Sequence, residues 1–239
     1  MRRKQTRGKE LMLTTNDQKT VRLKFSKQGP LIYISHLDLN RAFYRAFNRA
    51  DLPMVYSEGF SPRPRYNFAL PLSVGTSSVC EFVDIKLRGE ISPEEVRQRM
   101  SASLPSDIAI LDAYVPESKF SEITHAEYSI SIISHQISPD SRGLFSELLS
   151  SAEIIIQKKT KSGEKDTDIS PFIKRCDFTC RDGGCEIICL LCADSSNYLN
   201  PEYIIRYLDK GASLDLENDP DSLVEICRKK VMIGNSEFR

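Results

Sequence analysis

Hydrophobic and polar positions at the start of the chain alternate as in a strand. Residues 21–25 alternate apolar and polar side chains with a period of two, which is typical of a half-buried strand. The pattern resumes over 31–34, after a turn predicted at Gly29-Pro30. We therefore expect ordered structure to begin at Val21, with a strand, a turn and a continuation of the strand.

The strongest local signal predicts an amphipathic helix over residues 35–50. Ser35 is a typical N-cap residue, Asp38 completes a capping box, and Ile34 is placed to staple onto Leu39. Pro53 prevents the helix from continuing. The apolar residues that recur at helical spacing are Leu39, Ala42, Phe43, Ala46, Phe47 and Ala50.

The rest of the first half completes a βαββαβ order. A strand over 54–72 is interrupted by a proline-containing loop, and a second strand covers 81–87. Ser92 is the predicted N-cap of a helix with Pro93 at its first position. A strand over 108–115 closes the unit. This order is that of the ferredoxin-like fold.

The second half repeats the order more loosely and contains a charged excursion over 158–168 around Gly163. Its predicted strands cover 128–133, 154–157, 185–193 and 223–233, and its predicted helices cover 140–151 and 200–208. The prediction is thus an α+β fold of two tandem ferredoxin-like units with antiparallel sheets. Its parts are a flexible basic tail over 1–20, a ferredoxin-like domain over 21–118 and a second, more divergent one over 119–239.

A formal net charge of zero conceals a division of charge along the chain. Residues 1–75 contain 14 Lys and Arg against 5 Asp and Glu, which is a net charge of +9. The remaining residues contain 19 against 28, a net charge of −9. Such asymmetry is typical of a protein with one end that binds a polyanion.

Apolar runs are short throughout the sequence. The longest has seven residues, Ile187 to Ala193, against the roughly 18 of a membrane helix. The basic N-terminal stretch also lacks the apolar region of a secretory signal. Seven cysteines, an odd number, then favour reduced thiols over a disulfide framework. We expect a cytoplasmic protein with no membrane contact.

Three of the cysteines have the spacing of an iron–sulfur motif. Cys185, Cys189 and Cys192 form a C-x3-C-x2-C pattern, which presents three thiolates to a [4Fe–4S] cluster in radical SAM enzymes. On a strand, however, Cys185 and Cys189 share one face and Cys192 lies on the other. Cys176 and Cys180 match zinc spacing poorly. We expect core cysteines, no metal and no cofactor.

The basic face of the first helix is the candidate binding site. Arg41, Arg45 and Arg49 recur every four residues, and the following proline loop adds further arginines and interleaved aromatic residues, a combination suited to phosphates and unstacked bases. The alternative is a solvated face balanced by nearby carboxylates, including Asp51. The candidate residues are His36, Asp38, Arg41, Arg45, Arg49, Tyr56, Glu58, Phe60, Arg63, Arg65 and Tyr66.

His36 is the candidate for acid–base chemistry. It lies in the first turn of the predicted helix, where the helix dipole lowers the pKa of an imidazole and favours its neutral form. With Asp38, Tyr56 and the arginines it could form an acid–base site. No second histidine is nearby in the sequence, so a structural role for His36 is the alternative.

The same segments closely resemble a known bacterial family. The likeness covers YISHLDL at 33–39, YSEGFSP at 56–62, FALPL at 68–72 and the strand over 81–85, and it is looser in the second half. With these motifs the chain is identified as a member of the radical-SAM-associated (radical SAM-linked) protein family, a domain of unknown function. Arg63 stands where relatives often have a histidine, which argues against an acid–base role at that position.

The resemblance implies an accessory or substrate-handling partner of a radical SAM protein, in an RNA- or translation-linked process, rather than an enzyme. One alternative is an RNA-processing enzyme that uses His36, analogous in fold to the CRISPR RAMP endoribonucleases. The other is a protein-interaction module whose arginine face binds an acidic patch of the radical SAM partner. The substrate and the oligomeric state stay open.

Overall fold

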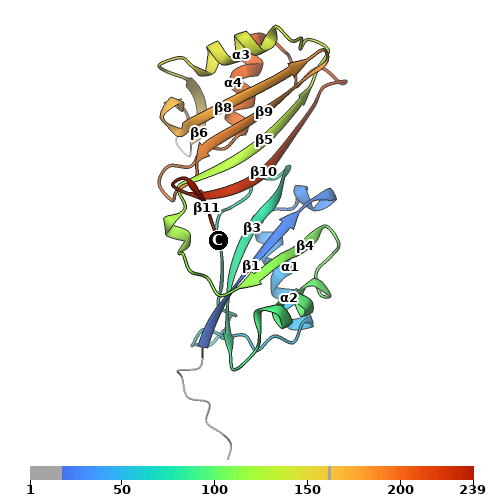
Figure 1. The fold of residues 1–239 in the computed structure, drawn as a ribbon, viewed down its shortest axis with the longest axis vertical. Helices are drawn as coiled ribbons and strands as arrows, with labels where there is room; N and C mark the ends of the chain where they lie inside the picture. The colour runs from blue at the N-terminus through green and yellow to red at the C-terminus, as the bar shows by residue number, and fades with distance from the viewer. Residues whose placement is uncertain (1–17, 161–162) are drawn as a thin grey trace, which may run out of the picture.

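The computed structural model describes residues 18–160 and 163–239. Its first half contains four strands and two helices in the order β-α-β-β-α-β (Figure 1). These are β1 (Gln18–Lys27), α1 (His36–Arg49), β2 (Tyr66–Phe68), β3 (Thr76–Arg88), α2 (Pro93–Ser101) and β4 (Ile108–Tyr114). β1 pairs with β4 and β3, and β2 pairs with β3, all antiparallel. The spatial order β4-β1-β3-β2 is that of a ferredoxin-like unit.

The second half has the same spatial order. Its elements are β5 (His125–Ile133), α3 (Ser141–Leu149), β8 (Ile173–Arg181), β9 (Gly184–Cys192), α4 (Glu202–Ala212) and β10 (Leu223–Ile233). The strands lie in the order β10-β5-β9-β8, and each neighbouring pair is antiparallel. The predicted α+β class with tandem ferredoxin-like units is confirmed.

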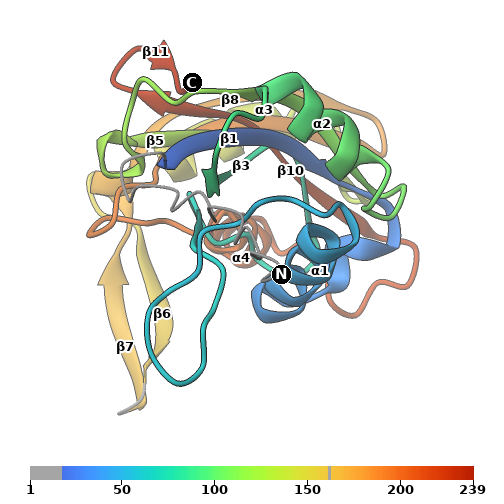
Figure 2. The ribbon, with the colours of Figure 1, turned by 90° about the horizontal axis from the view of Figure 1, so that it is seen from below.

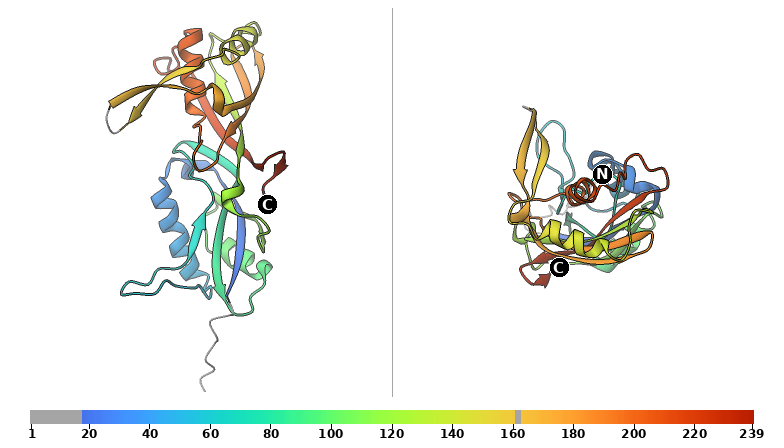
Figure 3. Two further views of the ribbon diagram at one scale, coloured as in Figure 1. Left: turned by 90° about the vertical axis from the view of Figure 1, so that its left-hand side faces the viewer. Right: turned by 90° about the horizontal axis from the view of Figure 1, so that it is seen from above.

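The two units are joined edge to edge by a short parallel seam. Three residues of β3, Thr76–Ser78, pair with Ile226–Arg228 of β10. With β11 (Ser236–Glu237) beside β10, nine of the described strands form one sheet. The strands pair antiparallel within each unit, as predicted, whereas the seam between the units is parallel. α1 and α4 lie on the same side of the sheet (Figure 3).

Several expected elements differ from the structure. Residues 31–34 do not continue the first strand, because Gly29 has φ +56° and begins a 3-10 helix, η1 (Gly29–Tyr33), that includes Pro30. The tail expected over 1–20 lies outside the described residues up to 17, and residues 18–20 belong to β1.

The strand expected over 154–157 is part of a separate hairpin. β6 (Ile155–Thr160) pairs only with β7 (Gly163–Asp168) among the described strands. The main sheet instead contains β8, which the sequence pattern missed. β8 is an edge strand with one half-buried face, and charged residues are as numerous as apolar ones along it.

Both helices of the first unit begin at the predicted caps. Ser35 Oγ accepts the N–H of Asp38 at 3.1 Å, and Ser92 Oγ accepts the N–H of Glu95 at 3.1 Å. The apolar face of α1 then packs onto β1 and β3. Phe43 lies 4.9 Å from Phe25, centroid to centroid, in a core separate from the one beneath α3 and α4.

A buried ion pair crosses the seam. Arg228 of β10 donates to Glu81 of β3 at 2.9 Å, to the Tyr128 hydroxyl at 3.1 Å and to the Pro71 carbonyl at 2.9 Å. Arg228 is 0% exposed and Glu81 is 4% exposed. Burial alone would lower the pKa of Arg228, but Glu81 and Tyr128 raise it above its ordinary value. The guanidinium therefore stays charged within the sheet.

A second buried arginine fixes the connection between the units and the last residues. Arg22 forms a bidentate pair with Asp84, at 2.7 and 2.9 Å, on the face of the sheet opposite α1. It also donates to Ser118 and to the main-chain oxygen of Arg239. Its guanidinium lies over the rings of Phe120 and Phe238, 4.4 and 4.6 Å from their centroids.

No helix in residues 18–160 and 163–239 is long and apolar enough to cross a membrane.

The seam pair predicts a large effect on stability. Arg228→Met leaves the buried Glu81 carboxylate without its guanidinium, so we expect the free energy of unfolding to fall by about 3–5 kcal/mol. Urea denaturation measures this change. The double variant Glu81→Leu/Arg228→Met should regain part of the loss, because neither charge is then buried alone.

The matched control for this prediction is Arg97→Met. Arg97 pairs with Glu94 on the surface of α2, and the loss of an exposed pair changes stability little. An Arg228→Met variant as stable as the Arg97→Met variant would show that the seam pair does not support the fold.

Candidate functional site

The outer face of α1 presents arginines in different states. Arg41 is exposed and pairs with Asp38 at 2.9 Å, whereas Arg49 turns toward α2 and donates to the Ser103 carbonyl. Arg45 lies between them on the exposed face, and its side chain forms no hydrogen bond or ion pair with any residue that the structure describes. The predicted stripe of three arginines therefore reduces to Arg45 as the free cation, with Arg41 partly neutralised.

The proline loop is a narrow two-stranded arm, which we call the 54–66 arm. The Ser57 N–H donates to the Arg63 carbonyl at 2.8 Å, and the Arg65 N–H donates to the Val55 carbonyl at 2.7 Å. Gly59, with φ +120°, allows the chain to reverse at the tip. The arm projects from the side of the sheet that carries α1 and α4, as does the β6–β7 hairpin (Figures 2 and 3).

Tyr66 joins the 54–66 arm to α1. Its hydroxyl donates to the Asn40 carbonyl at 3.4 Å, and its ring lies 5.0 Å from that of Phe47. Burial, and then the nearby Tyr44, raises the pKa of Tyr66 above its ordinary value. The predicted stacking residue Tyr66 is thus half-buried packing, which fixes where the arm leaves the core.

The exposed aromatic residues lie around the unpaired arginines. Phe60 is fully exposed at the tip of the arm, and Tyr56 is partly exposed. Arg63 and Arg65 are exposed on the returning strand, and their side chains form no ion pair within the described ranges. Glu58 is exposed at the tip as well.

Tyr44 is a member of this surface that the sequence prediction missed. It is exposed on α1 close to Tyr66. An aromatic residue on the polar face of an amphipathic helix was the signal that could have found it. The basic surface, as we define it from here on, consists of Arg41, Tyr44, Arg45, Tyr56, Phe60, Arg63 and Arg65.

His36 lies apart from its expected acid–base partners. Its ring packs edge-on against Phe68, 5.4 Å between centroids. The Asp38 carboxylate instead accepts a hydrogen bond from the Ser35 hydroxyl and pairs with Arg41, and these two contacts hold its pKa below the ordinary value. Burial lowers the pKa of His36, Glu81 opposes this shift and Lys27 adds to it. The direction agrees with the prediction, but desolvation causes it.

His36 lies close to the buried charged side chains at the seam, which we call the seam cluster: Lys27, Glu81 and Arg228. Lys27, which is 1% exposed, donates to the Ile32 carbonyl at 3.0 Å, and Glu81 lies near both. Sequence reasoning missed this cluster. The available signal was a charged residue within an apolar strand, such as Glu81 or Arg228.

The cysteines of the second unit lie on a sheet. Cys185 and Cys189 face the core under α3 and α4, whereas Cys192 is buried outside that cluster, as the strand period predicted. Among residues 18–160 and 163–239, no group of three or more His, Cys, Asp or Glu side chains is arranged to hold a metal ion.

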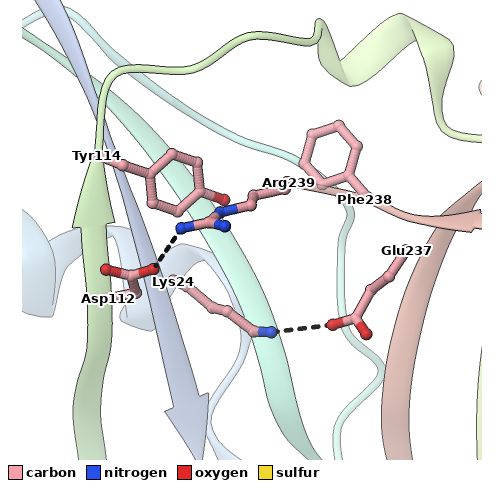
Figure 4. Close-up of a pocket in the computed structure, with 6 residues that line it drawn as sticks. All are labelled: Lys24, Asp112, Tyr114, Glu237, Phe238 and Arg239. Atoms are coloured by element: carbon pink, nitrogen blue, oxygen red, sulfur yellow. Dashed lines mark hydrogen bonds and ion pairs between the residues drawn. The ribbon is translucent and has the colours of Figure 1, made fainter.

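A small cavity lies on the opposite face of the sheet and contains none of the predicted residues. It has a volume of about 440 Å³ and is lined by the pairs Lys24–Glu237 at 3.1 Å and Arg239–Asp112 at 3.7 Å (Figure 4). The buried hydroxyl of Tyr114 has no described partner, and burial raises its pKa to about 12. Its charges are balanced, so the cavity selects neither anions nor cations.

The architecture defines an α+β protein of two ferredoxin-like units on one sheet. Residues 20–201 match a family described as an uncharacterized protein conserved in bacteria (DUF2344), and the chain belongs to this family. A comparison with curated proteins gives no match.

Two solved structures are similar in part. A chain in the crystal structure of a Cbf5-Nop10-Gar1 complex is 10% identical with a TM-score of 0.48, over 88% of this chain and 48% of that chain. This chain therefore spans about half the length of that neighbour. An unknown protein from Galdieria sulphuraria is 7% identical with a TM-score of 0.25, over 88% of this chain and 98% of that one.

The environment of His36 predicts a pH effect on stability. Its pKa in the folded protein is below the ordinary 6.5, so the unfolded chain binds the proton more tightly. The contribution of His36 to stability is therefore present above pH 6.5 and is lost as the pH falls below that value. In urea denaturation at several pH values above and below 6.5, His36→Gln should lose less stability on acidification than the wild type. An equal or greater loss in the variant would contradict this assignment.

Proposed function

We propose that the protein is a non-catalytic RNA-binding protein that handles substrate for a radical SAM enzyme, and that RNA binds to the basic surface. The observation that carries the proposal is the state of three arginines. Arg45, Arg63 and Arg65 are exposed, and none has an ion-pair partner among the described residues. They lie with exposed aromatic rings on α1 and the 54–66 arm.

Unpaired arginines favour an anionic partner. A guanidinium that is already paired with a carboxylate must give up that contact to bind phosphate, whereas a solvated one need not. Planar guanidinium groups also match phosphate with two hydrogen bonds. This surface therefore offers at least three phosphate contacts without breaking an internal pair.

The aromatic side chains favour unstacked bases over a duplex. Tyr44, Tyr56 and Phe60 are exposed on two different elements, and bases splayed from a single strand can stack on such rings. Each stacked base contributes about 1–3 kcal/mol to binding. Single-stranded RNA is therefore the form that we expect this surface to bind.

The contacts of His36 support a binding role rather than catalysis. A general base needs a partner or substrate proton within hydrogen-bond reach, and its ring instead packs on Phe68. Within the described residues, no side chain forms a hydrogen bond with the imidazole. Cleavage of the RNA in the binding test would favour the alternative, an RNA-processing enzyme.

The radical SAM partner is part of the proposal on the strength of the sequence resemblance alone. Co-purification with a radical SAM protein in high salt and with nuclease present would support direct contact between the proteins. Loss of the partner on nuclease treatment would indicate that RNA bridges the two proteins.

The basic surface predicts salt-dependent binding of single-stranded RNA. In fluorescence anisotropy titrations of a labelled single-stranded RNA, three phosphate contacts give a slope of log K against log salt of about −2. Arg45→Gln/Arg63→Gln/Arg65→Gln should bring the slope close to zero and weaken binding at low salt. Intact RNA after incubation is the expected result for a protein without nuclease activity.

The matched control removes the same kind of charge elsewhere. Arg97→Gln/Arg142→Gln/Arg181→Gln loses three arginines from α2, α3 and the end of β8, away from the basic surface. This control should bind RNA like the wild type. Equal loss in both variants would indicate a general charge effect, and binding that is insensitive to salt would refute the proposal.

A further inference from the structure

Two pairs of cysteines face each other across the β8–β9 hairpin. In the antiparallel register, Cys176 lies directly opposite Cys189, and Cys180 lies directly opposite Cys185 (β8 and β9 in Figure 1). Directly opposed residues of antiparallel strands have Cα atoms about 4.5 or 5.5 Å apart, within the range of about 4.4–6.8 Å that a disulfide bridges. The backbone of this hairpin therefore already has the spacing that a cross-strand disulfide requires.

The sulfurs of one pair are in contact. The Cys176 thiol donates to Cys189 Sγ at 3.2 Å, across the sheet and 13 residues apart in the sequence. Side-chain rotation alone can shorten this separation to a bond of about 2.0 Å. No strand has to change register for the two sulfurs to join.

The two thiols differ in access. Cys189 is 0% exposed, whereas Cys176 is half-buried and lines a cavity of about 260 Å³ between α3 and β8. The cavity walls are mostly polar: Ser146, Ser150, Ser151, Ser170, Lys174 and Arg175. A small polar molecule that enters the cavity reaches Cys176 and not Cys189.

We propose that Cys176 and Cys189 form a thiol–disulfide exchange site whose substrate is a small disulfide bearing carboxylates. Cys176 is the entry thiol, and Cys189 is the resolving thiol. Hydroxyl groups and the Lys174 ammonium along the cavity suit the carboxylates of such a substrate.

The exchange balances in two steps. The Cys176 thiolate, having given its proton to solvent, attacks one sulfur of the small disulfide; a protein–substrate mixed disulfide forms, and one thiol leaves after taking up a proton. Cys189 then attacks Cys176 Sγ and gives its proton to the second small thiolate, which leaves as a thiol. Two protein thiols are oxidised to one disulfide, and the small disulfide is reduced to two thiols.

The environment of Cys189 fits the second role. Its contact with Cys176, together with burial, raises its pKa well above the ordinary value, so Cys189 stays protonated while Cys176 is free. Once Cys176 is in the mixed disulfide, its sulfur lies next to Cys189. The order of the two steps follows from access and protonation together.

The test uses the full reduced chain and glutathione disulfide as the probe. After incubation, acid quenching and alkylation of free thiols, peptide mass spectrometry should find Cys176 joined to Cys189, with the protein lighter by two hydrogens. Cys189→Ala should stop at one glutathione on Cys176. Cys176→Ala should gain neither modification at this pair.

Cys180→Ala is the matched control, because it removes a half-buried cysteine of the same strand outside the proposed site. It should form the Cys176–Cys189 bond as the wild type does. If Cys189→Ala fails to fold, as judged by circular dichroism, the wild-type peptide map decides. A wild-type chain that stays reduced, or that forms only Cys180–Cys185, overturns the proposal.

Discussion

The ion pair between Glu81 and Arg228 is the contact on which the arrangement of the two units depends. Only three residue pairs of β3 and β10 form the seam, so the strand pairing by itself is short. Arg228 adds a buried pair to β3, a bond to Tyr128 in the second core and a bond to the Pro71 carbonyl. One guanidinium thereby connects both units and the loop that leads into the seam. Removal of the Arg228 guanidinium leaves the Glu81 carboxylate buried without its counter-charge, so we expect the short seam to be sensitive to substitution of Arg228.

The seam also determines what lies on each face of the molecule. Because β3 and β10 share one sheet, α1 and α4 lie on the same side, and so do the 54–66 arm and the β6–β7 hairpin (Figure 3). The basic surface is on this side. The opposite side holds Arg22, whose bonds to Asp84 and Ser118 fix the inter-unit connection.

Much of this fold was predictable because local chemistry determines it. The capping box at Ser35 and Asp38 and the proline after Ser92 set both helix starts in the first unit, and they do so in the structure. β8 was not predictable, since an edge strand buries only one face and its charged residues hide the period. The partners of Arg228, Glu81 and His36 depend on long-range contacts that no local pattern contains. For the site, the sequence located the arginines, but only the structure separates the unpaired Arg45, Arg63 and Arg65 from the paired Arg41 and Arg49.

The most direct test of the central claim is to map where RNA contacts the protein. Ultraviolet crosslinking of a bound single-stranded RNA, followed by peptide mass spectrometry, reports the residues on which bases stack. We expect crosslinks at Tyr44, Tyr56 or Phe60, on α1 and the 54–66 arm. Crosslinks confined to the opposite face of the sheet, around Tyr114 and Phe238, would contradict it.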